Sequence, residues 1–190
     1  MKRLDYYLQK ARIKQIAPFI IDGQQILDIG SAGGGMFRWL SDQKIDFSGI
    51  GIEPEIPTEI EKSGYKILKA KFPSSRITGR QFDVITALAV LEHVPVQQLK
   101  EFAAACNQHL KPGGLLLITV PSRLVDFIIK PLIWLGLMDG NRVDQHYGYD
   151  SALTIPLFSG EGFELKKHST FQMGLNNLYV FRKNYPNKST

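Results

Sequence analysis

A glycine-rich run, Ile26 to Gly35, closes a short apolar segment near the start of the chain. A turn of this kind between a buried strand and a helix lets a ligand approach the backbone closely, and the start of the helix offers free N–H groups to an anion. Asp28 lies two residues before Gly30, where a carboxylate would suit the ammonium group of a bound amino acid. The run therefore predicts a cofactor loop, and Asp28 favours a zwitterionic ligand.

A second carboxylate, Glu53, ends the next apolar run and comes 23 residues after Gly30. In this register an acid can accept hydrogen bonds from both hydroxyls of a ribose. The alternative is a solvated charge at a strand end beside Pro54. We expect Glu53 to bind the nucleoside part of the ligand.

These side chains need strands that end side by side, and the apolar pattern predicts such a sheet. Buried strands are expected at 24–29, 47–52, 65–68, 82–88, 115–120, 163–172 and 178–182. Helices are expected at 4–20, ended or bent by Pro18, and at 36–43, 95–110 and 151–161. The alternation predicts an α/β fold: a doubly wound, mostly parallel seven-stranded sheet with helices on both faces and an antiparallel last strand.

The 190 residues fit one domain with a substantial core, since 44% are hydrophobic and 22% charged. We expect this domain over 1–183, with an N-terminal helical segment at 1–22, a connection at 121–150 and a polar tail at 184–190. The most apolar stretch, Phe127 to Met138, falls short of the roughly 20 residues of a spanning helix. The net charge of +5 suits either an anionic partner or an ordinary surface, and nucleic acid binding is not expected.

The cysteine content restricts the class of protein further. Cys106 is the only cysteine, so a scaffold held by disulfides is excluded and a reducing cytoplasm is the simplest location. Cys106 falls on the apolar face of its predicted helix, which favours a core role over a nucleophile. With His109 it makes too few ligands for zinc, and no metal site is predicted.

Five short motifs occur in a fixed order. They are Leu27-Asp28-Ile29-Gly30, Gly51-Ile52-Glu53, Phe82-Asp83-Val84-Ile85, Leu91-Glu92-His93-Val94-Pro95 and Leu110-Lys111-Pro112-Gly113-Gly114. In this order they resemble the class I S-adenosylmethionine-dependent methyltransferases, most closely the group that contains the quinone O-methyltransferases. The resemblance spans residues 26–120.

The resemblance implies S-adenosyl-L-methionine as the cofactor and S-adenosyl-L-homocysteine as its product. The cofactor-binding residues that it implies are Asp28, Gly30, Ser31, Gly34, Glu53, Ala87 and Leu88. Asp28, Gly30 and Gly34 would surround the methionine part, Glu53 would hold the ribose, and the end of the fourth strand would lie near the sulfonium.

The chain also departs from the family pattern. Acids that members often carry after the third strand and near Ala89 are missing, because those stretches read Lys69-Ala70-Lys71 and Leu88-Ala89-Val90. The adenine contact is therefore unassigned. Asp83 enters its strand at the wrong end to substitute, and we expect a capping or surface role for it.

Methyl transfer to a hydroxyl requires a base, and a histidine with an ordinary pKa near 6.5 is suited to that role. His93 follows the fourth strand and His146 lies in a polar, aromatic cluster of the 121–150 connection. Both are candidate catalytic residues, although His93 could instead cap the following helix and His146 could be a surface residue.

The 121–150 connection occupies the place where the family builds its acceptor pocket. Its apolar content favours a lipophilic acceptor, peripheral contact with a membrane, or an amphipathic helix packed on the sheet. Arg123, Lys130 and Arg142 could face an anionic group on a small-molecule acceptor. The oligomeric state is left open.

Two other functions stay open. Gly30, Ala32 and Gly35 nearly match the dinucleotide fingerprint, as Gly30, Ala32 and Gly34 nearly match that of the methyltransferases, so a nicotinamide-dependent oxidoreductase is the first alternative. The missing acids leave a non-enzymatic cofactor-binding member as the second.

Overall fold

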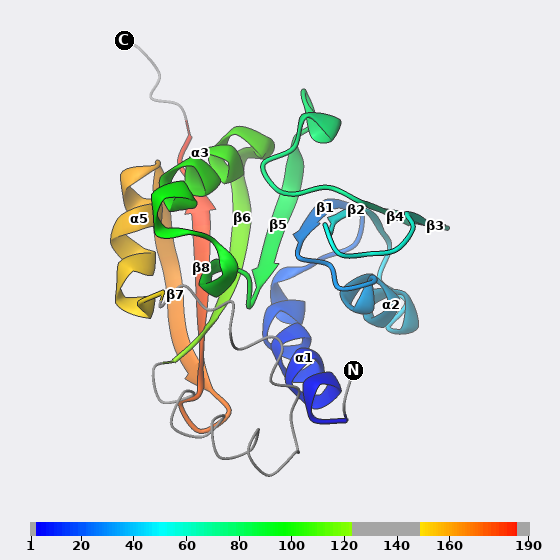
Figure 1. Ribbon diagram of the computed structural model, residues 1–190, viewed down its shortest axis with the longest axis horizontal. Coiled ribbons are helices and arrows are strands. Elements are labelled where there is room, and N and C mark those ends of the chain that lie inside the picture. The colour runs from blue at the N-terminus through cyan, green and yellow to red at the C-terminus, as the bar shows by residue number, and fades with distance from the viewer. Residues whose placement is uncertain (1–2, 123–148, 186–190) are drawn as a thin grey trace.

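The computed structural model describes residues 3–122 and 149–185 and shows one twisted sheet with helices on both faces (Figure 1). Within these residues the sheet has eight strands in the order β3-β4-β2-β1-β5-β6-β8-β7. The strands are β1 Gln24–Ile29, β2 Phe47–Ile52, β3 Ile60–Lys62, β4 Tyr65–Leu68, β5 Phe82–Leu88, β6 Leu110–Pro121, β7 Phe163–Phe171 and β8 Asn176–Lys183.

The five strands from β4 to β6 are parallel, and β8 lies antiparallel between β6 and β7. This confirms the doubly wound, mostly parallel sheet and its antiparallel last strand. The strand that the sequence did not predict is β3, which pairs antiparallel with β4. Its three residues, ending in a turn at Gly64 with φ +85°, are too few to show an alternating pattern.

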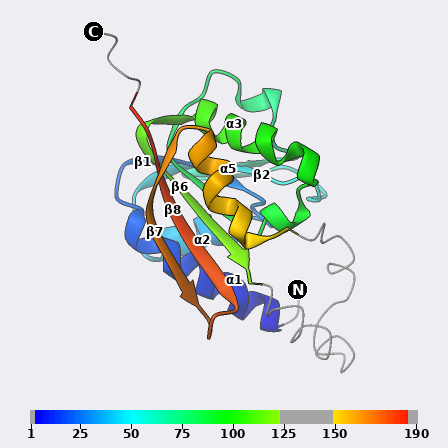
Figure 2. The same cartoon turned by 90° about the vertical axis from the view of Figure 1, so that its left-hand side faces the viewer.

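The helices are α1 Arg3–Ile16, α2 Gly35–Asp42, α3 Leu99–His109 and α5 Thr154–Gly160. Ile13 and Ile16 of α1 pack with Phe37 of α2 on one face of the sheet, and Phe102 of α3 packs with Phe158 of α5 on the other. Figures 1 and 2 show these two layers. None of the helices in the described ranges is long and apolar enough to cross a membrane.

Three helices differ in extent from their predicted ranges. The expected helix at 4–20 is α1, which ends at Ile16, followed by a 3-10 turn, Ala17–Phe19, that contains Pro18. The expected helix at 95–110 is a 3-10 turn, Val96–Gln98, followed by α3, because Pro95 holds an extended backbone at the turn's N-cap. The helix α5 is likewise preceded by a 3-10 turn, Ser151–Leu153. In all three cases the α-helix is shorter than predicted but keeps its place in the order of elements.

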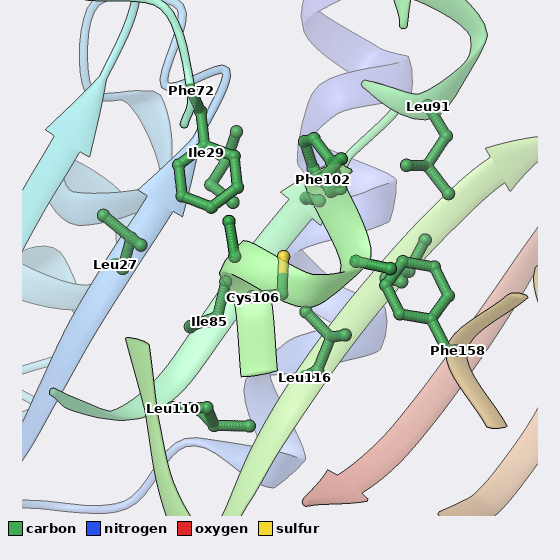
Figure 3. Packing of buried hydrophobic residues seen from close by; sticks show 14 of the residues in the cluster. Leu27, Ile29, Phe72, Ile85, Leu91, Phe102, Cys106, Leu110, Leu116 and Phe158 are labelled. Atoms are coloured by element: carbon green, nitrogen blue, oxygen red, sulfur yellow. The ribbon is translucent and has the colours of Figure 1, made fainter. Parts of the chain in front are cut away.

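The larger core cluster surrounds α3 (Figure 3). Cys106 is fully buried there among Ile85, Phe102 and Leu116, which confirms its predicted place on the apolar face. Burial raises the pKa of its thiol, so it is held as an unreactive side chain. The core therefore uses Cys106 as a small apolar residue.

The opposite core gives a test of packing at Gly49 in β2. A Cβ at Gly49 would lie 2.4 Å from Cε1 of Phe37, whose ring stacks on Phe47 and on Tyr65. We expect Gly49→Ala to lower the free energy of unfolding by about 1–3 kcal/mol through overpacking, measured by urea denaturation. Gly160→Ala is the matched control, because a Cβ there meets nothing within 4 Å and should change stability by less than about 0.5 kcal/mol. Equal stability of both variants and the parent would contradict the packing argument.

Candidate cofactor-binding site

The glycine-rich turn joins the end of β1 to the start of α2. Gly30, Gly33 and Gly34 have φ of +75°, +79° and +84°, and Ala32 has φ +42°. These left-handed conformations cost a glycine little and an alanine more. Ala32, the residue that departs from both fingerprints, thus carries the backbone conformation for which glycine is the usual choice.

Two of the glycines allow close approach to neighbouring strands. A Cβ at Gly30 would lie 2.6 Å from Cγ2 of Val90, and one at Gly34 would lie 2.8 Å from Cδ1 of Ile67. Gly30 also donates its N–H to the carbonyl of Ile52 at 2.9 Å. The turn therefore lies close to the ends of β2, β4 and β5, and the lack of a side chain at Gly34 serves packing against β4.

Asp28 is 3% exposed at the end of the central strand, and Oγ1 of Thr86 donates a hydrogen bond to its Oδ1 at 2.6 Å. Burial raises the pKa of the carboxyl to about 7; the Thr86 hydrogen bond lowers it and the nearby charge of Glu53 raises it. A carboxyl so held needs a cation to stabilise its charged form. Thr86 lies opposite Asp28 in the β1–β5 register. A hydroxyl residue within an otherwise apolar strand is the feature of the sequence that could have indicated this partner.

Ser31 lies just behind the first glycine of the turn and is buried. Its Oγ donates to the backbone carbonyl of Asp28 at 2.8 Å, and a Cβ at Gly51 would lie 2.2 Å from that oxygen. The hydroxyl thus fixes the turn against β2. A direct role of Ser31 toward the cofactor stays a prediction.

Glu53 is half-buried where β2 ends, and the structure brings it to the glycine turn. Its Oε2 accepts a hydrogen bond from the N–H of Ala32 at 2.9 Å, and its Oε1 accepts one from the N–H of Glu55 at 3.2 Å. Each carboxylate oxygen has a further lone pair. The side chain can therefore accept two hydroxyl donors in the geometry that it already has.

Ala87 and Leu88 end β5 beside the same turn, with Ala87 opposite Ile29 of β1. Ala89 follows with φ +57° and donates its N–H to the carbonyl of Thr119 at 2.9 Å. In the sheet, β1 pairs with β2, the next strand along the chain, on one side and with β5 on the other. This is the switch point at which open α/β sheets bind ligands.

Of the two catalytic candidates, the structure describes His93. His93 ends a 3-10 helix, Leu91–His93, and its side chain is exposed. The N-cap positions of the next two helices are Pro95 and Gln98, so His93 holds neither. His146 and most of the 121–150 connection, with Arg123, Lys130 and Arg142, lie outside the described residues.

Asp83 and Lys111, each from one of the motifs, form an ion pair far from the switch point. Nζ of Lys111 lies 2.8 Å from Oδ1 of Asp83, and the N–H of Gln25 donates to Oδ2 of Asp83 at 2.9 Å. Partial burial raises the pKa of Asp83, but these hydrogen bonds outweigh it and lower the pKa overall. The expected cap is therefore a bridge between β1, β5 and β6, and two of the motif residues are structural.

No group of three or more His, Cys, Asp or Glu side chains suited to a metal ion occurs in the part of the chain that the structure describes. The site residues are instead a glycine-rich turn, the buried carboxyl of Asp28 in the strand before it, and the carboxylate of Glu53, which accepts the N–H of Ala32 in the turn. This donor set fits a nucleoside joined to an amino acid.

Comparison with known proteins agrees with this geometry. A family profile described as a methyltransferase domain matches residues 1–165. The chain is 31% identical over 110 residues to a ubiquinone biosynthesis O-methyltransferase of Pseudomonas aeruginosa, covering 53% of this chain and 46% of that protein. It is 24% identical over 185 residues to the protein of the same name from Methylococcus capsulatus, covering 85% of this chain and 77% of the relative. The chain thus spans about half the length of the P. aeruginosa relative.

Among solved structures, the mycolic acid cyclopropane synthase CmaA1, crystallised with SAH and CTAB, superposes with a TM-score of 0.69 at 12% identity, over 92% of this chain and 84% of that one. This likeness shows the fold. Together with the family match, the bound SAH of that structure supports S-adenosyl-L-methionine as the cofactor. The resemblance read from the five motifs is confirmed: the chain belongs to the class I S-adenosylmethionine-dependent methyltransferase family.

Proposed function

We propose that this chain transfers a methyl group from S-adenosyl-L-methionine to a small-molecule acceptor. The observation that carries the proposal is the Asp28 carboxyl, 3% exposed beneath the glycine turn with a pKa raised to about 7. Burying a carboxyl costs free energy, which an ammonium group placed beside it would offset. A pyrophosphate over the same carboxyl would add like-charge repulsion.

Each predicted cofactor residue has a role in this proposal. The turn from Gly30 to Gly34, with Ser31 fixing it, would receive the methionine part beside Asp28, and Glu53 would accept the ribose hydroxyls. Ala87 and Leu88 at the end of β5 would line the reacting centre. The cofactor supplies a methyl group already activated by a sulfonium, so the chain has mainly to position the two reactants and exclude water.

The acceptor that we propose is a lipophilic small molecule with a hydroxyl group. Two observations support it: the ubiquinone biosynthesis O-methyltransferases among the relatives, and the apolar composition of residues 121–150. His93 and His146 are the candidate bases from the sequence, and the 1–183 domain boundary and the 184–190 tail likewise stay predictions. A cytoplasmic location, and peripheral contact with a membrane through the connection, also belong to this proposal.

Calorimetry with S-adenosylmethionine and S-adenosylhomocysteine tests the proposal directly. We expect both to bind, and NADH not to compete with either. Binding of NADH alone would favour the nicotinamide-dependent alternative. Incubation of a metabolite extract with methyl-labelled cofactor would then identify the acceptor, and cofactor binding without any labelled product would favour the non-enzymatic alternative.

The role of Glu53 gives a mutational test. Glu53→Ala removes the carboxylate that would accept the ribose hydroxyls, and we expect S-adenosylhomocysteine to bind more weakly by about 1–3 kcal/mol. Calorimetric titration measures the change. Glu55→Ala is the matched control, because Glu55 is an exposed neighbour that offers only its backbone N–H to Glu53. If Glu53→Ala binds S-adenosylhomocysteine as tightly as the parent does, Glu53 does not bind the ribose.

Asp28 gives a prediction in which stability and binding change in opposite directions. In the folded chain its pKa is about 7, against 3.8 for the ordinary group. As pH rises from about 4 to 7 the unfolded chain therefore releases the proton first, and the folded chain loses stability over this window. Asp28→Asn cannot ionise, so it should match the parent near pH 4 and exceed it by about 1–4 kcal/mol at pH 8 in urea denaturation.

The same variant should lose affinity for S-adenosylhomocysteine by about 10- to 100-fold at pH 8, because the ammonium loses its charged partner. Full affinity in Asp28→Asn would contradict the placement of the amino acid part beside Asp28. Lower stability than the parent at pH 8 would contradict the destabilising burial.

A further inference from the structure

Thr86 is a fully buried hydroxyl residue in β5, and the cofactor contacts proposed above leave it without a role. It lies opposite Asp28, and its Oγ1 donates to Oδ1 of that carboxyl at 2.6 Å. Two weaker acceptors lie near the same hydroxyl, the carbonyl of Leu27 at 3.4 Å and the sulfur of Met36 at 3.6 Å. The hydroxyl therefore has several acceptors within reach, and only the carboxyl among them can carry a charge.

The single hydrogen of the hydroxyl can bind only one of these acceptors at a time. A hydrogen bond to a charged carboxylate is shorter and about twice as strong as one to a neutral group. When Asp28 is ionised, the hydrogen is best placed on Oδ1. When Asp28 is protonated, Oγ1 can accept the carboxyl proton and turn its own hydrogen to the carbonyl of Leu27. Thr86 thus has a partner in both states and favours the ionised one, in which its bond is stronger.

The rest of the surroundings oppose the ionisation of Asp28. Burial raises the pKa of the carboxyl, the Thr86 hydrogen bond lowers it and the charge of Glu53 raises it, and the result is about 7. Gly51, opposite Asp28 in β2, adds no side chain. None of the described charged side chains of α1 and α2, the helices on this face, is among the causes of the shift; they are Lys10, Arg12, Lys14, Arg38 and Asp42. Before a ligand arrives, the charged form is therefore stabilised by Thr86.

We propose that Thr86 is a positioning residue of the cofactor site: it fixes the Asp28 carboxylate that receives the ammonium, and the cofactor binds as this carboxyl gives one proton to solvent. This inference rests on the proposed function and adds a proton to the binding reaction of the same site. The ammonium keeps its three hydrogens and the released proton is that of Asp28. A neutral acid is replaced by an ion pair, so charge and atoms balance.

The coupling of the two events sets how affinity depends on pH. Below pH 7 most copies of the free protein carry the proton, so the affinity for S-adenosylhomocysteine should fall about tenfold for each further pH unit. Above pH 7 the carboxyl is already ionised in the free protein, and the affinity should level off. A site whose carboxyl does not titrate near neutrality predicts a flat profile over the same range.

Calorimetry of S-adenosylhomocysteine binding in buffers of different ionisation enthalpy measures the released proton directly. Asp28→Asn has no proton to give, so it supplies the background from every other group, the ligand amine included. Above this background we expect the parent to release about 0.9 protons at pH 6 and about 0.5 at pH 7. Binding with release below about 0.2 protons at pH 6 would overturn the inference and leave the proposed function intact. Absence of binding would overturn both.

The decisive variant is Thr86→Val, which keeps nearly the same side-chain size and removes the hydroxyl. Without this donor the carboxylate is less stabilised, so the pH at which affinity levels off should rise by about one unit. S-adenosylhomocysteine should then bind about tenfold more weakly at pH 6 but only about twofold more weakly at pH 8, and the proton release at pH 7 should rise to about 0.9. Thr86→Ser keeps the donor and should restore the profile of the parent.

Thr119→Val is the matched control. Thr119 is equally buried, in β6, and within residues 3–122 and 149–185 its Oγ1 has no hydrogen-bond partner. Loss of this hydroxyl should leave the pH profile and the proton release unchanged. If Thr86 acts in packing alone, Thr86→Val will behave in the same way, with a changed melting temperature and an unchanged pH profile, and the proposal is wrong.

The free protein gives a readout that needs no cofactor. The folded parent should lose stability as pH rises from about 4 to 7, and in Thr86→Val this loss should extend about one pH unit higher in urea denaturation. If Thr86→Val does not fold, Thr86→Ala takes its place in both experiments. An unchanged pH window in a folded variant would overturn the role of Thr86 as the donor that favours the charged carboxylate.

Discussion

The burial of the Asp28 carboxyl is the constraint on which the rest of the site depends. Asp28 is 3% exposed in β1, which lies between β2 and β5. Thr86 supplies one hydrogen bond from the neighbouring strand. Because Asp28 is buried, its carboxyl stays protonated in mildly acidic solution, and ionising it lowers the stability of the folded chain. A cation bound beside the carboxyl would stabilise its charged form.

The two halves of the sheet use different topologies. The residues that we propose for the cofactor lie on the parallel strands β2, β1 and β5, whose carboxyl ends meet by the rule of the doubly wound sheet. On the other side of β5, the end of β6 meets the start of β8, because β8 runs antiparallel to β6 and places Asn176 opposite Pro121. The antiparallel pair at the sheet edge therefore contributes polar groups as well as core.

Much of the fold could be predicted because its central strands are buried on both faces and appear as continuous apolar runs. The strand β3 could not, since three residues with one partner show no periodicity. Spacing drew attention to Gly30 and Glu53, but only the structure shows that Glu53 accepts the N–H of Ala32, in the turn that Gly30 begins. The pattern of neighbouring residues in the sequence does not predict a hydrogen bond between two turns that lie 21 residues apart.

Glu92, in the 3-10 helix that follows β5, shows the same limit. The motif that contains it drew attention to His93, because histidine is the usual base, while an isolated glutamate in a loop is usually exposed. The structure reverses the exposures: Glu92 is buried and His93 exposed. Burial of a charged residue in a 3-10 turn depends on what α1 and β6 place over it, and that tertiary information is absent from local sequence.

The bond between Glu53 and the N–H of Ala32 has a consequence for the rate of recognition. Because this carboxylate already fixes the turn, an arriving nucleoside meets a receptor whose backbone is set, and little ordering entropy is lost on binding. For the glycine turn, association should then be governed by diffusion and orientation, without a slow rearrangement of the turn itself. Discrimination between the substrate and the product form of the cofactor would then lie in how fast each one leaves.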